Sequence, residues 1–191
     1  MKHTGSLFPL LLVGVLAALT FWLQTISEGP AGDRSGRHRH DPDFIIDSFS
    51  VRSFGSAGTL QNTLSATRML HYPDDDTTTV IAPRVIFHAT PPTQLSAEQA
   101  LVSKDAKQVR LEKNVRLVRG AESGGLPIEA STERLDVVPD LETASTDTPV
   151  TITQGRSVVT GSGLIADNKT RQTTLLGPVR GVIHRDAGKT P

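Results

Sequence analysis

The chain has 191 residues, no cysteine, and 20 basic against 20 acidic residues. Absence of cysteine excludes disulfides, thiolate metal ligands and cysteine nucleophiles. A net charge of zero provides no field that would attract nucleic acid, so that class of partner is not expected. Aromatic residues make up only 4% of the chain, and a core must therefore be built from Val, Leu and Ile.

The first predicted element is a membrane-spanning helix over residues 7–26. This segment reads LFPLLLVGVLAALTFWLQTI and carries no charge, and about 20 apolar residues suffice to cross a bilayer as a helix. A cleaved signal peptide is the alternative, but it needs small residues before the cut. The bulky Phe21-Trp22-Leu23 near the end of the segment favours an uncleaved anchor instead.

The flanks of this helix bear on its orientation. Only Lys2 precedes it, whereas Arg34, Arg37 and Arg39 follow it, so the positive-inside rule does not decide the orientation. The rule weakens for long translocated domains. We therefore expect residues 1–6 to be a cytoplasmic stub and the rest of the chain to lie on the far side of the inner membrane.

A flexible linker is predicted over residues 27–41, which are rich in Gly, Pro and Arg and lack apolar periodicity. His38 and His40 alternate with arginines in this segment. Neighbouring cations oppose metal binding, and a metal site needs more ligands, held rigidly. A solvated linker is the interpretation that we favour.

One all-β domain is predicted over residues 42–185, followed by a disordered tail over residues 186–191. Apolar residues alternate with polar ones, as in Val85-x-Phe87, Val109-x-Leu111 and Val150-x-Ile152, which is typical of strands with one buried face. Turn-forming clusters such as Pro73-Asp74-Asp75-Asp76 separate these segments. Short strands between such turns favour a sandwich, barrel or jelly roll.

The domain also contains a weak internal repeat. A small residue after an apolar-x start recurs at Ala66, Ala97, Ala130 and Gly161, at spacings of 31, 33 and 31 residues. Each unit ends at Pro83-x-Val85, Asn114-Val115, Pro149-Val150 or Pro178-Val179. Such a repeat predicts stacked β units that cover one another's apolar faces. The stack would end in open edges that invite strand addition, and its interior would be either a packed core or a slot for acyl chains.

The sequence shows no catalytic constellation. It has no phosphate-binding glycine loop, no His-Glu-x-x-His motif and no Gly-x-Ser-x-Gly elbow. Asp74-Asp75-Asp76 lacks the spaced ligands of a calcium loop and reads as a solvated turn. Glu129 and Glu133 do not form a hydrolytic carboxylate pair in a strand-rich chain. We expect a protein that is not an enzyme and has no metal and no cofactor.

These features together resemble the LptC family of lipopolysaccharide export proteins. The resemblance covers nearly the whole chain: a lone N-terminal span, a linker, and then the repeated units. The segments that carry it are Leu64-x-Ala66 with Tyr72-Pro73-Asp74 and Pro83, Leu95-x-Ala97-x-x-Ala100, Gly161-x-Gly163-Leu164, and Leu175-Leu176-x-x-Val179-Arg180.

The resemblance implies a twisted β jelly roll with an open groove, located in the periplasm. It implies that lipopolysaccharide arrives from the inner-membrane ABC transporter LptB/LptF/LptG at the N-terminal edge and leaves to periplasmic LptA at the C-terminal edge. The lipid-contacting groove positions correspond to Phe49, Val80 and Thr173, and a structural glycine and the partner edge to Gly155 and Val179. The alternative is a membrane-tethered scaffold with a closed core that recruits partners by edge pairing without binding lipid.

Overall fold

The computed structural model describes residues 16–23, 40–121 and 125–184. The chain divides into two units, Met1–Arg39 and His40–Pro191. The described part of the first unit is a helix over residues 16–23, inside the predicted span of residues 7–26. In the described ranges, no helix combines the length and the apolar character needed to cross a membrane. The predicted stub, nearly all of the linker and the predicted tail lie outside the described residues.

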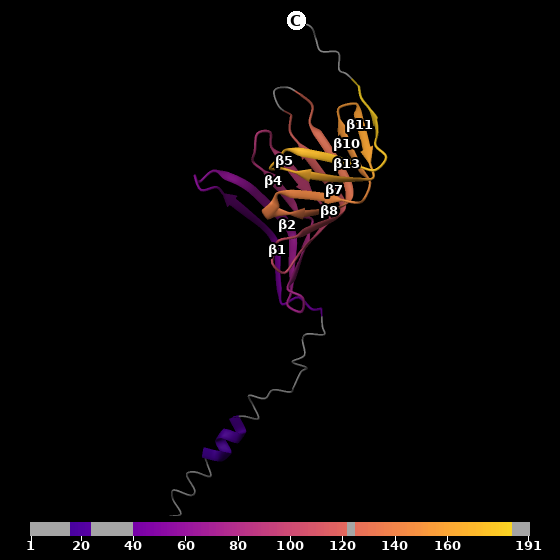
Figure 1. Cartoon of the computed structure of the whole chain (residues 1–191). Coiled ribbons are helices and arrows are strands. Elements are labelled where there is room, and N and C mark those ends of the chain that lie inside the picture. The colour runs from indigo at the N-terminus through magenta and orange to yellow at the C-terminus, as the bar shows by residue number, and fades with distance from the viewer. Residues whose placement is uncertain (1–15, 24–39, 122–124, 185–191) are drawn as a thin grey trace, which may run out of the picture. The chain divides into compact units, whose positions relative to one another are not determined.

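The second unit is all-β, as predicted. Its described part contains fourteen strands in one hydrogen-bonded sheet and a short 3₁₀ turn, η2 (Pro139–Leu141). The strands are β1 (Phe44–Phe54), β2 (Leu60–Tyr72), β3 (Thr77–Ile81), β4 (Arg84–Phe87), β5 (Thr93–Ser96), β6 (Gln99–Val102), β7 (Val109–Arg119), β8 (Ile128–Val138), β9 (Thr143–Thr146), β10 (Val150–Gln154), β11 (Ser157–Gly161), β12 (Gly163–Asp167), β13 (Gln172–Leu176) and β14 (Arg180–Val182). Figure 1 shows β1 and β2 at one end of the domain and β10 and β11 at the other.

The sheet splits into two layers because its long strands change partners along their length. The start of β2 pairs with β4 and its end with β3. The start of β7 pairs with β6 and its end with β5. The start of β8 pairs with β10 and its end with β9. Layer A therefore contains β3, β6, β9, β12 and β13, layer B contains β4, β5, β10, β11 and β14, and β1, β2, β7 and β8 run through both.

The sequence repeat marks the line where the chain crosses between the layers, which we call the corner. Ala66, Ala97 and Gly161 lie where the chain leaves layer B for layer A. Pro83, Pro149 and Pro178 lie between a strand of layer A and the next strand of layer B. Proline suits these positions because it donates no ladder hydrogen bond and ends a strand. Each repeat of 31 to 33 residues is thus one passage to layer A and one back.

The strand β7 crosses the corner without a break, through a bulge. Lys113 and Asn114 are left out of the pairing with β8, whose register shifts between Glu112 and Val115. Both residues have positive φ, 63° and 52°, a left-handed conformation that asparagine tolerates better than most side chains. The bulge turns the strand from one layer into the other.

The corner also changes the spacing of inward-facing side chains. Inside a strand, alternate residues face the same side. Across the corner, successive core positions are three or four residues apart, as with the partly buried Ala97 and the buried Ala100, and with Leu111 and Val115. This slip keeps the apolar side chains between the layers after the chain has turned.

The core lies against the corner and draws on both layers. Val80, Ala100, Leu111 and Leu135 of layer A share one buried cluster with Leu95 and Val115 on the layer B side and with Ala66. A shared cluster requires the two layers to face each other. Val115, next to the bulge, is only 2% exposed.

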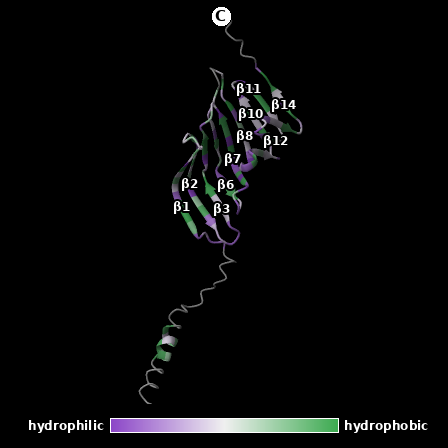
Figure 2. Cartoon of the chain, turned by 60° about the vertical axis from the view of Figure 1, so that its left-hand side comes forward, coloured by the Kyte–Doolittle hydropathy of each residue, from purple (hydrophilic) through white to green (hydrophobic). Residues whose placement is uncertain are grey.

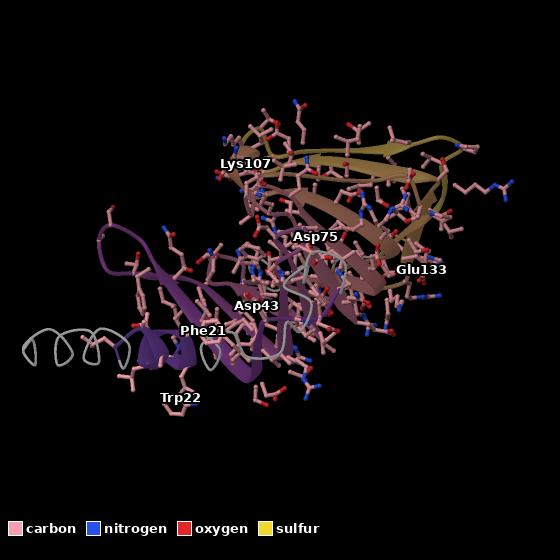
Figure 3. All side chains as sticks on the ribbon, turned by 90° about the horizontal axis from the view of Figure 1, so that it is seen from below. Phe21, Trp22, Asp43, Asp75, Lys107 and Glu133 are labelled. Atoms are coloured by element: carbon pink, nitrogen blue, oxygen red, sulfur yellow. The ribbon has the colours of Figure 1, made fainter. Side chains whose placement is uncertain are left out.

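The outward faces carry the charges. Cross-strand ion pairs join Asp47 to Arg68, Arg110 to Asp136 and Arg116 to Glu129. Figure 3 shows the labelled Lys107 and Glu133 side chains at the periphery of the domain. Because these pairs are exposed, each contributes little to stability, and the corner must supply most of it.

A substitution in the bulge tests this dependence on the corner. We expect Asn114→Val to lower the free energy of unfolding by about 1–2 kcal/mol, because a β-branched residue resists a positive φ. Asn114→Gly should be nearly neutral, since relief of the left-handed strain offsets the added freedom of the unfolded chain. Urea unfolding followed by circular dichroism measures both. Equal stability of the two variants would contradict a strained bulge.

Candidate functional site

The candidate site is the interior between the two layers, and continuous rows of side chains line it. In layer A, the corner-side row crosses five strands through the directly paired residues Met69, Val80, Ala100, Leu111 and Leu135. The rim row, one inward position further from the corner, comprises His71, Thr78, Val102, Val109, Val137, Ala144, Ala166 and Thr173. Directly paired residues share one face of a sheet, so each row is one continuous surface.

Layer B repeats the arrangement. Its corner-side row comprises Val51, Leu64, Val85, Leu95, Leu117, Ala130, Ile152 and Val159. Its rim row comprises Ser53, Asn62, Phe87, Thr93, Arg119, Ile128, Gln154 and Ser157. None of these inward positions on the described strands carries an Asp or Glu, so the four rows hold no carboxylate pair for hydrolysis.

Burial falls from the corner toward the rim. In layer A, Val80 and Leu111 are 6% and 4% exposed, whereas their rim-row neighbours Val102 and Val109 are only partly buried. In layer B, Leu95 is 8% exposed but the neighbouring rim-row residue Phe87 is 38% exposed. Apolar side chains toward the rims therefore keep surface that another apolar group can cover.

All three predicted lipid contacts occupy inward positions, but they do not form one pocket. Phe49 on β1 lies opposite Ala66 and packs partly buried against the core. Val80 on β3 is itself a core residue. Thr173 on β13 is exposed, opposite Ala166 at the end of the rim row. The three are distributed from β1 to β13, along the length of layer A.

A family model described as "LptC: Lipopolysaccharide-assembly, LptC-related" matches residues 10–184. The chain belongs to the LptC-related family. This confirms the family that the sequence motifs indicated.

Comparison with solved structures adds a neighbour for the fold of this LptC-related chain. It is similar to the crystal structure of LptH, described as the LptA homologous periplasmic component of the conserved lipopolysaccharide transport device from Pseudomonas aeruginosa. The TM-score is 0.51 at 9% sequence identity, over 65% of this chain and 95% of the other. At that identity the likeness shows the fold alone. No curated protein matches the chain.

The remaining two predicted residues of the LptC-related chain lie at its C-terminal end. Val179 directly precedes β14 and is 50% exposed. Gly155 starts the two-residue turn between β10 and β11, with φ +58°. A methyl group at Gly155 would overlap the Leu126 side chain. The need for glycine thus has two causes, the left-handed backbone and a leucine from the segment before β8.

Sequence reasoning missed one cluster at the start of the domain. The His40 ring stacks on Tyr72 at 3.9 Å between ring centroids and makes a 3.0 Å hydrogen bond from Nδ1 to Asp74 Oδ2. The hydrogen bond to Asp74 raises the pKa of His40. Hydrogen bonds from Thr77 lower the pKa of Asp75, the third member of the cluster.

The ligand atoms of His40, Asp74 and Asp75 lie within 4.8 Å of one another, a spacing that a metal ion could use. All three residues are exposed, and Asp74 and Asp75 already accept hydrogen bonds from His40 and Thr77. These contacts fix the start of the domain to the β2–β3 turn. Nothing in the sequence links the two, because 34 residues separate His40 from Asp74.

The two causes of the glycine requirement can be separated by experiment. Gly58 also has a positive φ, +76°, but open space where a methyl group would lie. We expect Gly58→Ala to cost about 1 kcal/mol of unfolding free energy, from the backbone alone. Gly155→Ala should cost roughly 2–3 kcal/mol, because overlap with Leu126 is added.

The double variant Gly155→Ala/Leu126→Ala isolates the overlap. We expect it to be less destabilised than the sum of the single variants by about 1 kcal/mol, since the two side chains are in contact. Chemical unfolding of the parent chain, the variants Gly155→Ala and Leu126→Ala, and the double variant measures this coupling. Strict additivity would show that Leu126 does not cause the glycine requirement.

Proposed function

We propose that this LptC-related chain receives lipopolysaccharide from an inner-membrane transporter and passes it to a periplasmic partner, with the acyl chains held between layers A and B. The observation that supports this proposal is that the inward-facing side chains become less buried from the corner to the rim. An interior that is packed at one side and partly exposed at the other corresponds to a twisted β jelly roll with an open groove. Family membership and the LptA-like fold of the neighbour support the same cargo.

The energetics favour binding without chemistry. Each Å² of apolar surface removed from water contributes about 25 cal/mol to the free energy of binding. Acyl chains that cover the apolar side chains of the rim rows are therefore stabilised there. The rim row of layer A from Thr78 to Thr173 is made of Thr, Val and Ala side chains, which offer the tails a surface without charged groups. We therefore infer movement of lipid along the rows rather than capture at one point, and no catalytic step.

The rows run the length of the domain, which suits transfer between partners at its two ends. At one end β1 pairs only with β2, and its Phe44 and Ile45 are each 52% exposed. At the other end β14 pairs only with β11, and its Val182 is 61% exposed. Figure 2 shows apolar, green segments on β1 and near β14. Such half-paired apolar strands favour strand addition by another chain.

We assign the β1 edge to the transporter LptB/LptF/LptG and the β14 edge to LptA, with the domain in the periplasm and the apolar segment of residues 7–26 anchoring the chain in the inner membrane. This order places the incoming edge next to the anchor in sequence. The chain has no nucleotide-binding loop, so directional work must come from the transporter.

A lipid-free scaffold is the second candidate, and one observation favours it. Val80, a predicted lipid contact, is 6% exposed and lies in the packed core. If the interior were filled along its whole length in the same way, the domain would only recruit partners by its edges. The exposed rim positions are therefore the ones that distinguish the two functions.

Thr173 and Thr174 offer a matched pair for the test. They are exposed neighbours on β13, but Thr173 pairs with Ala166 on the inward face and Thr174 with Ile165 on the outward face. A photo-crosslinking amino acid at each position, with lipopolysaccharide detected on the shifted band in cells, compares the two faces. We expect a lipid adduct at Thr173 and none at Thr174. Equal adducts, or none at Thr173 in a folded and anchored protein, would favour the scaffold.

A further inference from the structure

The outward face of layer B carries a continuous row of hydroxyl side chains and arginines, which we call the arginine row. The row follows directly paired residues across the face from β1 to β14. Its members are Ser50, Ser65, Arg84, Ser96, Arg116, Ser131, Thr151, Thr160 and Arg180. Because directly paired residues share one face of a sheet, the arginine row is a single polar strip without a carboxylate.

A second outward row lies beside the arginine row and supplies the other charges of this face. It comprises Arg52, Thr63, Ile86, Gln94, Val118, Glu129, Thr153, Val158 and Val182. The only carboxylate at these described strand positions, Glu129, pairs with Arg116. The exposed side chains of Arg52, Arg84 and Arg180 have neither an ion pair nor a hydrogen bond within the described ranges. Three cations of this face are therefore uncompensated.

The outward face of layer A has no such excess. Its arginines Arg68, Arg110 and Arg134 each pair with a carboxylate. Glu112 and Asp167 add further acids at outward positions of the same layer. The positive charge is thus confined to one of the two outer faces of the domain, and an anionic partner would distinguish between them.

The length of the arginine row favours a flat anionic surface over one bound anion. Neighbouring strands lie about 4.8 Å apart, so Arg84 and Arg116, two strands apart, are separated by about 10 Å, and Arg180 lies about 19 Å beyond Arg116. Each guanidinium therefore meets a different anion. Its planar fork of N–H donors matches the paired oxygens of a phosphate, and the hydroxyl groups between the arginines offer further donors.

The sequence keeps this face within reach of a bilayer. Only residues 27–43 separate the uncharged segment of residues 7–26 from the start of β1 at Phe44. A flexible chain of that length spans about 20–25 Å, and such a tether raises the local concentration of the domain at the surface that holds the anchor. Three more arginines lie in the connecting segment, Arg34, Arg37 and Arg39.

We propose that the outward face of layer B docks on anionic phospholipid headgroups of the membrane that holds residues 7–26. The headgroup phosphates accept hydrogen bonds from Arg52, Arg84 and Arg180, and the attraction acts only within a short distance of the surface. This contact orients the domain and leaves the outward face of layer A toward water. The inference goes beyond the proposed function and shares with it only the membrane anchor.

The test uses the full-length chain in lipid nanodiscs and a matched pair of labelling sites. Ser131 and Ser145 are both exposed serines at outward positions, but Ser131 lies on the layer B part of β8 and Ser145 on β9 of layer A. The chain has no native cysteine, so Ser131→Cys and Ser145→Cys each carry one fluorescent dye. The discs contain a lipid with a quencher on its headgroup, in phosphatidylcholine alone or with about a third of phosphatidylglycerol.

We expect the dye at position 131 to be quenched several-fold more in the anionic discs than in the neutral ones, and the dye at position 145 to respond equally in both. At about 1 M salt, which screens charges within about 3 Å, the difference should disappear. The double variant Arg84→Gln/Arg180→Gln should lower the ratio of docked to free domain about tenfold. The control Lys107→Gln/Lys169→Gln removes the same charge from turns of layer A and should match the parent chain.

Equal quenching at position 131 in neutral and anionic discs would overturn the proposal and would leave an acidic protein as the partner of this face. Equal effects of the two double variants would also overturn it, because net charge rather than the arginine row would then be responsible. Failure of the anchor appears separately, as a chain that leaves the discs on gel filtration. The same two dyes then test docking of the face on added anionic discs.

Discussion

The structure depends on the corner, the line along which one continuous sheet folds back on itself. A sheet that bends must either end its strands at the bend or leave residues there out of the strand pairing, and this chain does both. Prolines end strands between β3 and β4 and between β9 and β10, whereas β7 passes through with a two-residue bulge. Every other feature follows from how tightly the layers are held together there.

Because the layers are joined at the corner, burial is concentrated near it. Val115 and Leu111 are among the most buried residues, and the rows beyond them are progressively more exposed. A closed sandwich would bury both edges of its interior equally. Residues near the corner thus stabilise the fold, and residues of the same strands near the rim are available for binding. A side chain near the rim can therefore contact a ligand without disturbing the core.

The sequence predicted the strands and the family, but not which residues on both sides of the corner face the interior between the layers. Alternation identified Val109-x-Leu111 as one face of a strand, and the repeat placed Pro83 and Asn114 at equivalent positions, because both signals are local. The three-residue step at the corner is set by pairing between strands, so alternation along the chain does not predict that Ala97 and Ala100 face the same side.

Contacts between distant segments were equally inaccessible. The resemblance predicts the glycine at 155, but one of its two causes is Leu126, which belongs to the segment before β8. His40 was predicted to be a solvated linker residue, and the structure places it on Tyr72 and Asp74. Both contacts depend on register between strands, which short sequence patterns do not specify.

The most direct test of the account compares the two faces of β8 when lipid is present. The chain has no native cysteine, so single spin labels at Val137→Cys, in the rim row, and at Asp136→Cys, on the outward face, report separately. Adding lipopolysaccharide to the full-length protein should shield the label at position 137 from a polar relaxation agent and leave the label at position 136 unchanged. Equal responses at both positions, or no change at 137, would contradict an interior that holds acyl chains.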